Sequence, residues 1–298
     1  MAVPFDQRDG EIWFDGAFVP WTDAKVHVLT HALHYASAVF EGERAYGGEI
    51  FKCEAHTDRL FASAETLGFE IPYSKDEISR AKREALARTG LADAYIHPLA
   101  WRGSEMMGVS AQHNTIHAAI AVWAWPSYFD PALLEKGIRL DMAKWRRPSP
   151  ETAPSHAKAA GLYMICTLSK HSAEAKGYTD ALMLDYRGHV AEATGANVFF
   201  VKDGVIHTPT PDCFLDGITR RTVIDLARAR GIEVVERTIM PDELASFESC
   251  FLTGTAAEVT PVGEIGPYNF TVSPMVRTLM KDYTAAVHPK GAGMREVA

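Results

Sequence analysis

The chain has 298 residues, of which 47% are hydrophobic and 23% are charged, and its formal net charge is −8. This balance is typical of a soluble globular protein with sizeable cores and argues against extended disorder, and the length allows two domains. The acidic charge disfavours nucleic acid and anionic membranes as main partners, because neither attracts a net-negative surface.

The amino terminus and the cysteines indicate where the protein works. No basic segment followed by an apolar core opens the chain, and no apolar run approaches the roughly 20 residues that cross a bilayer. Cys53, Cys166, Cys213 and Cys250 are far apart and form no Cys-x-x-Cys pair, so neither a disulfide framework nor a metal site is expected. We therefore expect a cytoplasmic protein with free thiols.

The first part of the chain predicts a small sheet with two helices. Asp15-Gly16 and Gly47-Gly48 each stand between apolar runs, a pattern that favours β-hairpins because these residues tolerate positive φ. Hydrophobic spacing predicts two helices and then two strands, over residues 56–67, 75–88, 95–101 and 116–125. Together these elements predict an α+β domain over residues 1–125.

A proline-bounded stretch from Pro126 to Pro131 predicts an interdomain linker over residues 126–134, followed by a second domain over 135–298. Its predicted strands and helices cover residues 137–143, 162–176, 181–186, 189–192, 197–202 and 217–230. Glu192 stands at a strand end, where its side chain can point into a cleft. Gly217-Ile218-Thr219 begins a helix, so its backbone N–H groups and hydroxyl could bind a phosphate.

One lysine stands out by its surroundings. Lys158 lies in the segment Ser155-His-Ala-Lys-Ala-Ala-Gly-Leu-Tyr163, whose small residues leave room for a flat ligand beside the amine. Leu252-Thr-Gly-Thr-Ala-Ala257 likewise has the glycine and small residues that allow successive backbone N–H groups to converge on an anion. Taken alone, a solvated lysine and an ordinary loop would account for both segments.

Taken together, six segments resemble the fold-type IV (class IV) pyridoxal-phosphate enzymes, most closely the branched-chain aminotransferases. They occur in the family's order and are His31–Tyr35, Val39–Gly42, Ala157–Ala159, Glu192–Asn197, Gly217–Arg220 and Gly254–Glu258. The resemblance implies an α+β fold with two α/β domains and the active site between them. It also implies pyridoxal phosphate (PLP) as cofactor, and transamination between an amino acid, with branched-chain L-amino acids favoured, and a 2-oxo acid such as 2-oxoglutarate.

The resemblance also implies roles for individual residues. Lys158 would bind the cofactor aldehyde covalently and then move the Cα proton of the substrate, while Glu192 would hold the proton on the pyridine nitrogen. Tyr163 would hydrogen-bond the ring oxygen. The phosphate would be bound by Arg59, Ile218, Thr219 and Thr255. The substrate pocket would be lined by Tyr35, Phe40, Arg44, Tyr95, Trp125 and Tyr128, with the backbone at Ala256 and Ala257 binding the α-carboxylate.

Assembly follows from the same resemblance. The segment Met106-Met-Gly-Val109 corresponds to a loop that reaches into the neighbouring subunit's site, so Val109 is expected at that site in a homodimer or a higher homo-oligomer.

The chain departs from the bacterial branched-chain enzymes at His97, where they commonly carry an arginine that binds the side-chain carboxylate of glutamate or 2-oxoglutarate. Trp101-Arg102-Gly103 resembles the Thr-Arg-Gly or Ser-Arg-Gly of the D-amino-acid and lyase branches. We expect Arg102 to bind that carboxylate instead, so that the enzyme still uses dicarboxylate substrates and accepts a broader range of amino donors. The alternative is that Arg102 is a strand-end surface arginine.

Other functions on the same fold stay open: an (R)-amine or D-amino-acid transaminase, or an aminodeoxychorismate lyase. A different class would be a non-catalytic relative in which Lys158 is merely structural. The joint presence of Lys158, Glu192, Arg59 and Thr219 argues against that last function.

Overall fold

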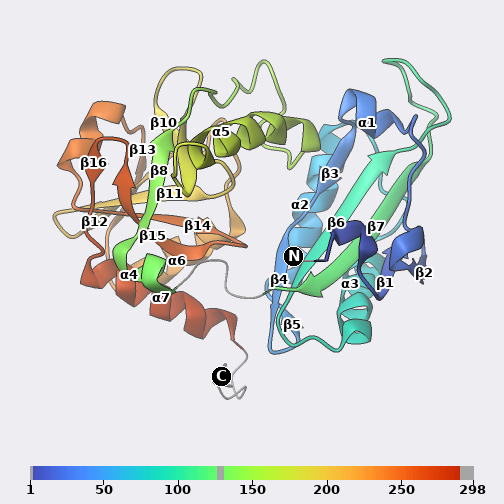
Figure 1. The fold of residues 1–298 in the computed structure, drawn as a ribbon, viewed down its shortest axis with the longest axis horizontal. Coiled ribbons are helices and arrows are strands. Elements are labelled where there is room, and N and C mark those ends of the chain that lie inside the picture. Colours follow the sequence, from blue (N-terminus) through green and yellow to red (C-terminus); the bar gives the residue numbers. More distant parts are fainter. Residues whose placement is uncertain (1–2, 126–130, 289–298) are drawn as a thin grey trace. The chain divides into compact units, whose positions relative to one another are not determined.

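The computed structural model describes residues 3–125 and 131–288 (Figure 1). By their contacts these residues divide into two compact units, the first containing the chain up to Trp125 with residues 157–161 and 287–288, and the second containing the rest. Both units combine helices and strands, which confirms the predicted α+β class. Among the residues described, no helix is long and apolar enough to cross a membrane.

The first unit is built on a seven-stranded antiparallel sheet in the order β2-β1-β7-β6-β4-β5, with β3 also paired to β6. The strands are β1 Glu11–Phe14, β2 Ala17–Pro20, β3 Ala38–Phe40, β4 Glu43–Tyr46, β5 Glu49–Ile50, β6 Ala94–Arg102 and β7 Ile116–Ala124. Both predicted hairpin turns are confirmed, because Asp15-Gly16 and Gly47-Gly48 all have positive φ. The helices are α1 His31–Tyr35, α2 Cys53–Thr66 and α3 Lys75–Thr89.

The two faces of this sheet differ in character. On one face, Ile96 and Ala100 of β6 pack in a core with Leu60 of α2 and Ile78 of α3. Helix α3 is held in place at its start by a capping box in which Ser74 and Glu77 exchange hydrogen bonds. Because side chains alternate along a strand, the residues between Ile96 and Ala100 that point the other way form the second face.

The second unit contains a nine-stranded sheet in the order β10-β9-β8-β15-β14-β11-β12-β13, with β16 paired to β15. Strand β10 also pairs with β11, so six of these strands close into a ring. The strands are β8 Ile138–Met142, β9 Asp180–Leu184, β10 Val190–Ala193, β11 Asn197–Lys202, β12 Val205–Pro209, β13 Val234–Arg237, β14 Ser249–Gly254, β15 Glu258–Ile265 and β16 Tyr268–Asn269. Its helices are α4 Pro131–Lys136, α5 Met164–Glu174, α6 Ile218–Ala229 and α7 Pro274–Val287.

The lysine segment differs from its predicted place in the second domain. Ala159 forms a β-bridge with Val39, the Phe40 N–H donates to the Lys158 carbonyl (3.2 Å), and the Lys158 N–H donates to Ser63 Oγ (2.9 Å). These contacts group residues 157–161 with the first unit. The domain limits drawn from the sequence otherwise stay a prediction, and residues 126–130 of the expected linker lie outside the described part of the chain.

Candidate active site

Lys158 is fixed beside an aromatic ring of the first unit. The bridge to Val39 holds its backbone next to β3, and the amine Nζ lies 4.8 Å from the centroid of the Phe40 ring. Ala157 and Ala159 on either side are buried. Gly161 is also required, since a Cβ there would lie 2.9 Å from Cβ of Ala36. The small residues of this segment therefore allow close packing that orients the lysine.

The second face of the sheet carries aromatic and polar side chains from four strands, β3, β4, β6 and β7. The register places Arg44 opposite Tyr95, and Tyr95 opposite Trp123. Tyr95 and Trp123 stack with ring centroids 5.0 Å apart, and Trp125 lies 4.8 Å from Tyr95. Gly42 must be glycine because a Cβ there would meet the Tyr95 hydroxyl oxygen at 1.9 Å. We call Phe40, Tyr95, His97 and Trp123 the aromatic wall; Arg44 stands beside it, opposite Tyr95.

His97 is a neutral member of this wall. Its ring lies 5.4 Å from that of Phe40, and burial together with the positive charge of Lys158 lowers the pKa of His97 to about 4. An imidazole with this pKa carries no charge at neutral pH. Within the described residues, His97 Nδ1 and Trp123 Nε1 are buried without a hydrogen-bond partner, which is typical of a surface that meets a ligand.

Arg59 projects from α2 and contacts a buried carboxylate. Its Nε donates to Glu41 Oε1 (2.6 Å) and its Nη2 to Glu41 Oε2 (2.9 Å), and Glu41 is fully buried. Burial raises the pKa of Glu41, but the charge of Arg59 and hydrogen bonds from His56 and Arg59 outweigh it, so the pKa stays well below its usual range. Glu41 is therefore ionised and fixes the guanidinium.

In the second unit, Glu192 lies at the end of β10 as the sequence predicted. Its carboxylate accepts a hydrogen bond from Asn197 Nδ2 (3.3 Å) and forms an ion pair with Arg147 Nε (3.3 Å). The β10–β11 register pairs Glu192 directly with Asn197 across the turn at residues 194–196. Gly217 packs so closely on Asn197 that a Cβ would lie 2.2 Å from Asn197 Oδ1. Asn197 and Arg147 therefore contact the carboxylate directly, and Gly217 packs against Asn197.

The start of helix α6 is suited to an anion. Gly217 is its N-cap residue, no side chain caps the helix, and its first turn has no acidic residue. Ile218 and Thr219 in that turn are buried. The first N–H groups of a helix have no hydrogen-bond partner within it, and the helix dipole makes the potential at this end positive. No acidic residue of the first turn offsets that potential.

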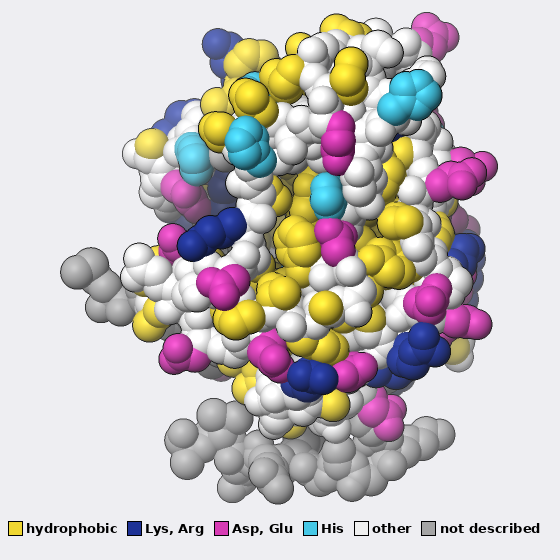
Figure 2. Space-filling view, turned by 90° about the vertical axis from the view of Figure 1, so that its right-hand side faces the viewer, with side chains coloured by type: hydrophobic (Ala, Val, Ile, Leu, Met, Phe, Trp, Pro, Cys, Tyr) yellow, Lys and Arg dark blue, Asp and Glu magenta, His cyan; other side chains and the backbone are white. Residues whose placement is uncertain are grey.

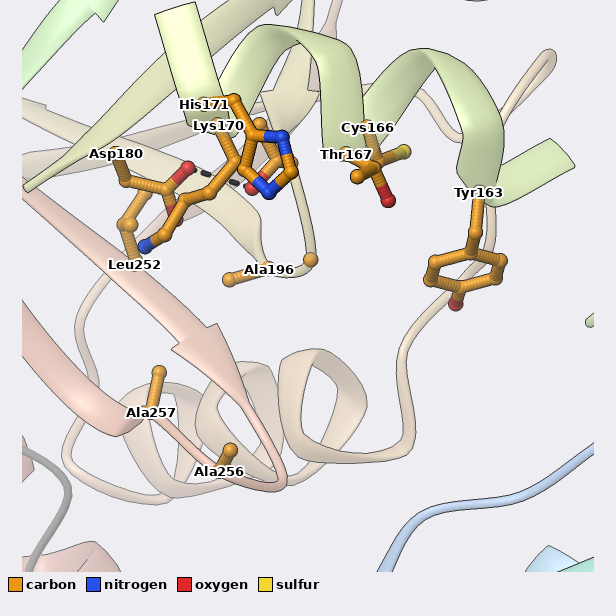
Figure 3. A pocket seen from close by; sticks show the side chains of 12 residues that line it. Tyr163, Cys166, Thr167, Lys170, His171, Asp180, Ala196, Leu252, Ala256 and Ala257 are labelled. Carbon is orange, nitrogen blue, oxygen red and sulfur yellow. Dashed lines mark hydrogen bonds and ion pairs between the residues drawn. The ribbon is translucent and has the colours of Figure 1, made fainter. Parts of the chain in front are cut away.

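A cavity of about 290 Å³ lies within the second unit. Figure 3 shows Tyr163 at the start of α5, Ala196 in the β10–β11 turn, and Ala256 and Ala257 after β14 around it. A Cβ on Gly195, which also lines the cavity, would meet no atom within 4 Å. Neither Glu192 nor the start of α6 lines this cavity. The glycine-lined opening, the positioned carboxylate and the uncapped helix are therefore separate features of the second unit, each of a kind that a planar, phosphorylated pyridine ligand requires.

The structure does not place Arg102 with the other predicted residues. Its Nη1 donates to the Ala111 carbonyl (3.1 Å) and its Nη2 to the Gly68 carbonyl (2.7 Å). Arg102 and His97 are an odd number of positions apart on β6, so their side chains leave opposite faces of the sheet. This geometry corresponds to the alternative of a strand-end structural arginine rather than to a carboxylate anchor on the aromatic wall.

Two other predicted substrate residues, Tyr35 and Val109, are not part of the wall. Tyr35 is 44% exposed and stacks on His31 with centroids 4.6 Å apart, and Val109 is 87% exposed. Tyr128 lies outside the described residues. Two residues that the sequence did not single out, Arg147 and Asn197, contact Glu192. Asn197 could have been found from its place across a tight turn from Glu192, whereas the proline-rich segment around Arg147 has no such signal.

Known proteins resemble this chain over most of its length. Residues 38–265 match the family model for amino-transferase class IV. A probable branched-chain-amino-acid aminotransferase of Rickettsia conorii is 44% identical over 88% of this chain and 89% of its own length. The branched-chain-amino-acid aminotransferase of Pseudomonas aeruginosa is 45% identical over 87% of this chain and 85% of its own.

Solved structures agree with these relatives. The branched-chain amino acid aminotransferase of Escherichia coli superposes with a TM-score of 0.91 at 36% identity, covering 96% of this chain and 98% of its own. The Thermobaculum terrenum enzyme in its PLP form gives 0.86 at 31% identity, covering 94% of each chain. The resemblance stated from the sequence is confirmed: the chain belongs to the class IV amino-transferase family and is a PLP-dependent aminotransferase.

Proposed function

We propose that this enzyme transfers the amino group of branched-chain L-amino acids to a 2-oxo acid such as 2-oxoglutarate. The observation that carries the proposal is the aromatic wall beside Lys158, in which the only imidazole is neutral. Such a wall favours an apolar side chain through burial of apolar surface. The names of the relatives support the same substrate class. Turnover of L-leucine, D-alanine and an (R)-amine with 2-oxoglutarate tests it, and preference for either of the last two would contradict it.

The alternative activities were left open because they share the fold. The Trp101-Arg102-Gly103 segment resembles the D-amino-acid transaminase and lyase branches, but the Arg102 guanidinium is bound to two backbone carbonyls away from the aromatic wall. The (R)-amine transaminase has no specific support among the described residues.

Roles in PLP binding are proposed for residues of each unit. When bound through its aldehyde, this cofactor supplies an electron-accepting ring that eases cleavage of the Cα–H bond of an amino acid. The Lys158 amine would bind the aldehyde, and as a free amine it would accept the Cα proton and later return it. The Glu192 carboxylate, which contacts Arg147 and Asn197, would keep a proton on the ring nitrogen. The Tyr163 hydroxyl would donate to the ring oxygen.

The phosphate and the substrate carboxylate are assigned to separate groups. Arg59, the Ile218 N–H and the hydroxyls of Thr219 and Thr255 are proposed to bind the phosphate, where an arginine and an uncapped helix start supply positive charge. The N–H groups of Ala256 and Ala257 are proposed to bind the α-carboxylate of the substrate. Its side chain is proposed to contact Phe40, Arg44, Tyr95 and Trp125. Tyr35, Tyr128 and Val109 are proposed as further members of the pocket.

Removal of Arg102 tests the corrected role of this residue. We expect Arg102→Ala to leave the ratio of kcat/KM for 2-oxoglutarate to that for pyruvate within about twofold of wild type, because its donors serve the Gly68 and Ala111 carbonyls. His97→Ala should change that ratio more, since His97 belongs to the aromatic wall. Selective loss of 2-oxoglutarate use in the Arg102 variant would restore the carboxylate anchor predicted from the sequence.

The enzyme is further proposed to be a homodimer or a higher homo-oligomer in the cytoplasm. Large apolar side chains are exposed along α1 and the loop after β6, including Leu33, Met106 and Val109. Figure 2 shows further hydrophobic side chains in the middle of one face, with a few acidic and histidine side chains among them. Apolar surface of this kind is typical of an interface between subunits. His31 Nε2 and the Gly108 carbonyl, 2.8 Å apart, hold the loop.

Substitution of Val109 by aspartate should weaken that assembly. A charge placed at an apolar subunit contact is desolvated without a partner, so we expect Val109→Asp to shift the protein toward monomers and to lower kcat/KM at least about tenfold. Light scattering coupled to size exclusion measures the first effect and steady-state kinetics the second. The matched control is Val3→Asp, another exposed valine of the first unit. Unchanged mass and kinetics in the Val109 variant would remove this loop from the interface.

A further inference from the structure

A buried carboxylate determines how Arg59 is presented. Glu41 follows β3 and is fully buried, whereas the Arg59 side chain is 17% exposed. Two donors of the guanidinium, Nε and Nη2, are bound to the two oxygens of Glu41 at 2.6 and 2.9 Å. This two-point hydrogen bond fixes the plane of the guanidinium as well as its position. A lone arginine would instead lose substantial rotamer entropy on binding a ligand.

His56 makes a second contact with the Glu41 carboxylate. His56 lies one helical turn before Arg59 on α2, so the two side chains share a face of the helix. His56 Nδ1 lies 2.7 Å from Glu41 Oε2, and His56 is buried. Burial lowers the pKa of His56 below its usual range, so the neutral ring donates its Nδ1–H to the carboxylate. Glu41 therefore has one orientation, which it imposes on Arg59.

The neighbouring acid shows that burial alone does not produce this arrangement. Glu43 is also fully buried and its partner is Lys82 (2.8 Å), not Arg59. Burial raises the pKa of Glu43 to about 8, although the charge of Lys82 opposes the shift. Of these two acids, only Glu41 is held ionised against a guanidinium. Since a buried ion pair adds little stability compared with apolar residues of similar volume, a role in specific orientation is a reason to retain it.

Building on the proposed role of Arg59 in phosphate binding, we infer that Glu41, supported by His56, is a positioning residue that fixes the Arg59 guanidinium for the cofactor phosphate. Two effects of Glu41 have opposite signs. The negative charge of Glu41 offsets the positive charge of Arg59 and so weakens the attraction of a phosphate. Its two hydrogen bonds orient the Arg59 donors in advance and so strengthen binding. The inference is that orientation dominates.

Binding of PLP and of pyridoxal, which lacks the phosphate, separates these effects. The full-length chain freed of cofactor is titrated with each compound, and the visible absorbance is followed. We expect Glu41→Gln to raise the Kd for PLP by about 10- to 100-fold, the range typical when a residue that orients a ligand group is removed. The Kd for pyridoxal should stay within about twofold. Glu41→Asp keeps the charge but shortens the side chain, so it should shift PLP binding in the same direction.

The variants Glu43→Gln and Arg59→Ala are the controls for these titrations. Glu43→Gln alters an equally buried acid that does not touch Arg59, so it should leave the ratio of the two Kd values unchanged. Arg59→Ala should raise the Kd for PLP alone, and if it does not, the phosphate role of Arg59 is what fails. If the Arg59 variant behaves as expected, tighter PLP binding in Glu41→Gln, or equal weakening of PLP and pyridoxal, overturns the inference. Because both ligands require folded protein, partial unfolding does not change the ratio.

Discussion

Replacement of Lys158 by alanine is expected to abolish transamination. No other amine among the described residues is proposed to bind the cofactor aldehyde, and the same amine is proposed to move the Cα proton. General acid–base catalysis alone contributes about 10²–10⁴-fold, and the covalent role adds to it, so kcat should fall below about 10⁻⁴ of the wild-type value. Steady-state rates with L-leucine and 2-oxoglutarate measure this.

A matched lysine variant guards against a general effect of charge removal. Lys176 is exposed in the second unit and pairs with Asp141, so Lys176→Ala should retain wild-type rates. Near-wild-type turnover in Lys158→Ala would instead show that another group performs the chemistry.

The Glu192→Gln variant should keep the cofactor and lose most of its rate. Contact with an opposite charge shifts a pKa by about 1–3 units, and a neutral amide cannot hold a proton on the ring nitrogen as a carboxylate does. We therefore expect kcat to fall by roughly 10²-fold or more, with the visible absorbance of bound cofactor retained. Asn197 and Arg147 would still contact the amide, so the fold of the turn should survive.

The control for this substitution is Glu264→Gln. Glu264 is paired to Arg139 at the surface of the same unit, and its replacement should leave kcat within about twofold of wild type. A rate in Glu192→Gln within a factor of two of wild type would remove the carboxylate from the mechanism.

Local chemistry made much of the fold predictable. The α3 limits follow from Ser74, Glu77 and Gly90, which satisfy the helix ends in the expected way. The hairpins at Asp15-Gly16 and Gly47-Gly48 follow from the tolerance of these residues for positive φ. Such signals lie within a few residues of one another, so they can be interpreted from sequence alone.

Contacts between segments that are far apart in the chain were harder to predict from the sequence. Nothing near Lys158 indicates that Ala159 pairs with Val39, which moves the lysine segment into the first unit. Arg147 contacts Glu192 although the two residues are 45 positions apart, and the proline-rich segment that carries Arg147 gives no signal of this contact. The expectation for Arg102 did not take strand alternation into account, which places Arg102 and His97 on opposite faces of the sheet and which can be read from the sequence itself.

The central claim is that Lys158 binds PLP covalently. Reduction of the cofactor-loaded enzyme with borohydride, followed by proteolysis and mass spectrometry, locates the attachment directly. We predict a single phosphopyridoxyl adduct on the peptide that contains Lys158, with loss of the visible absorbance band. An adduct on a different lysine, or no adduct on a protein that retains its cofactor, would contradict the account.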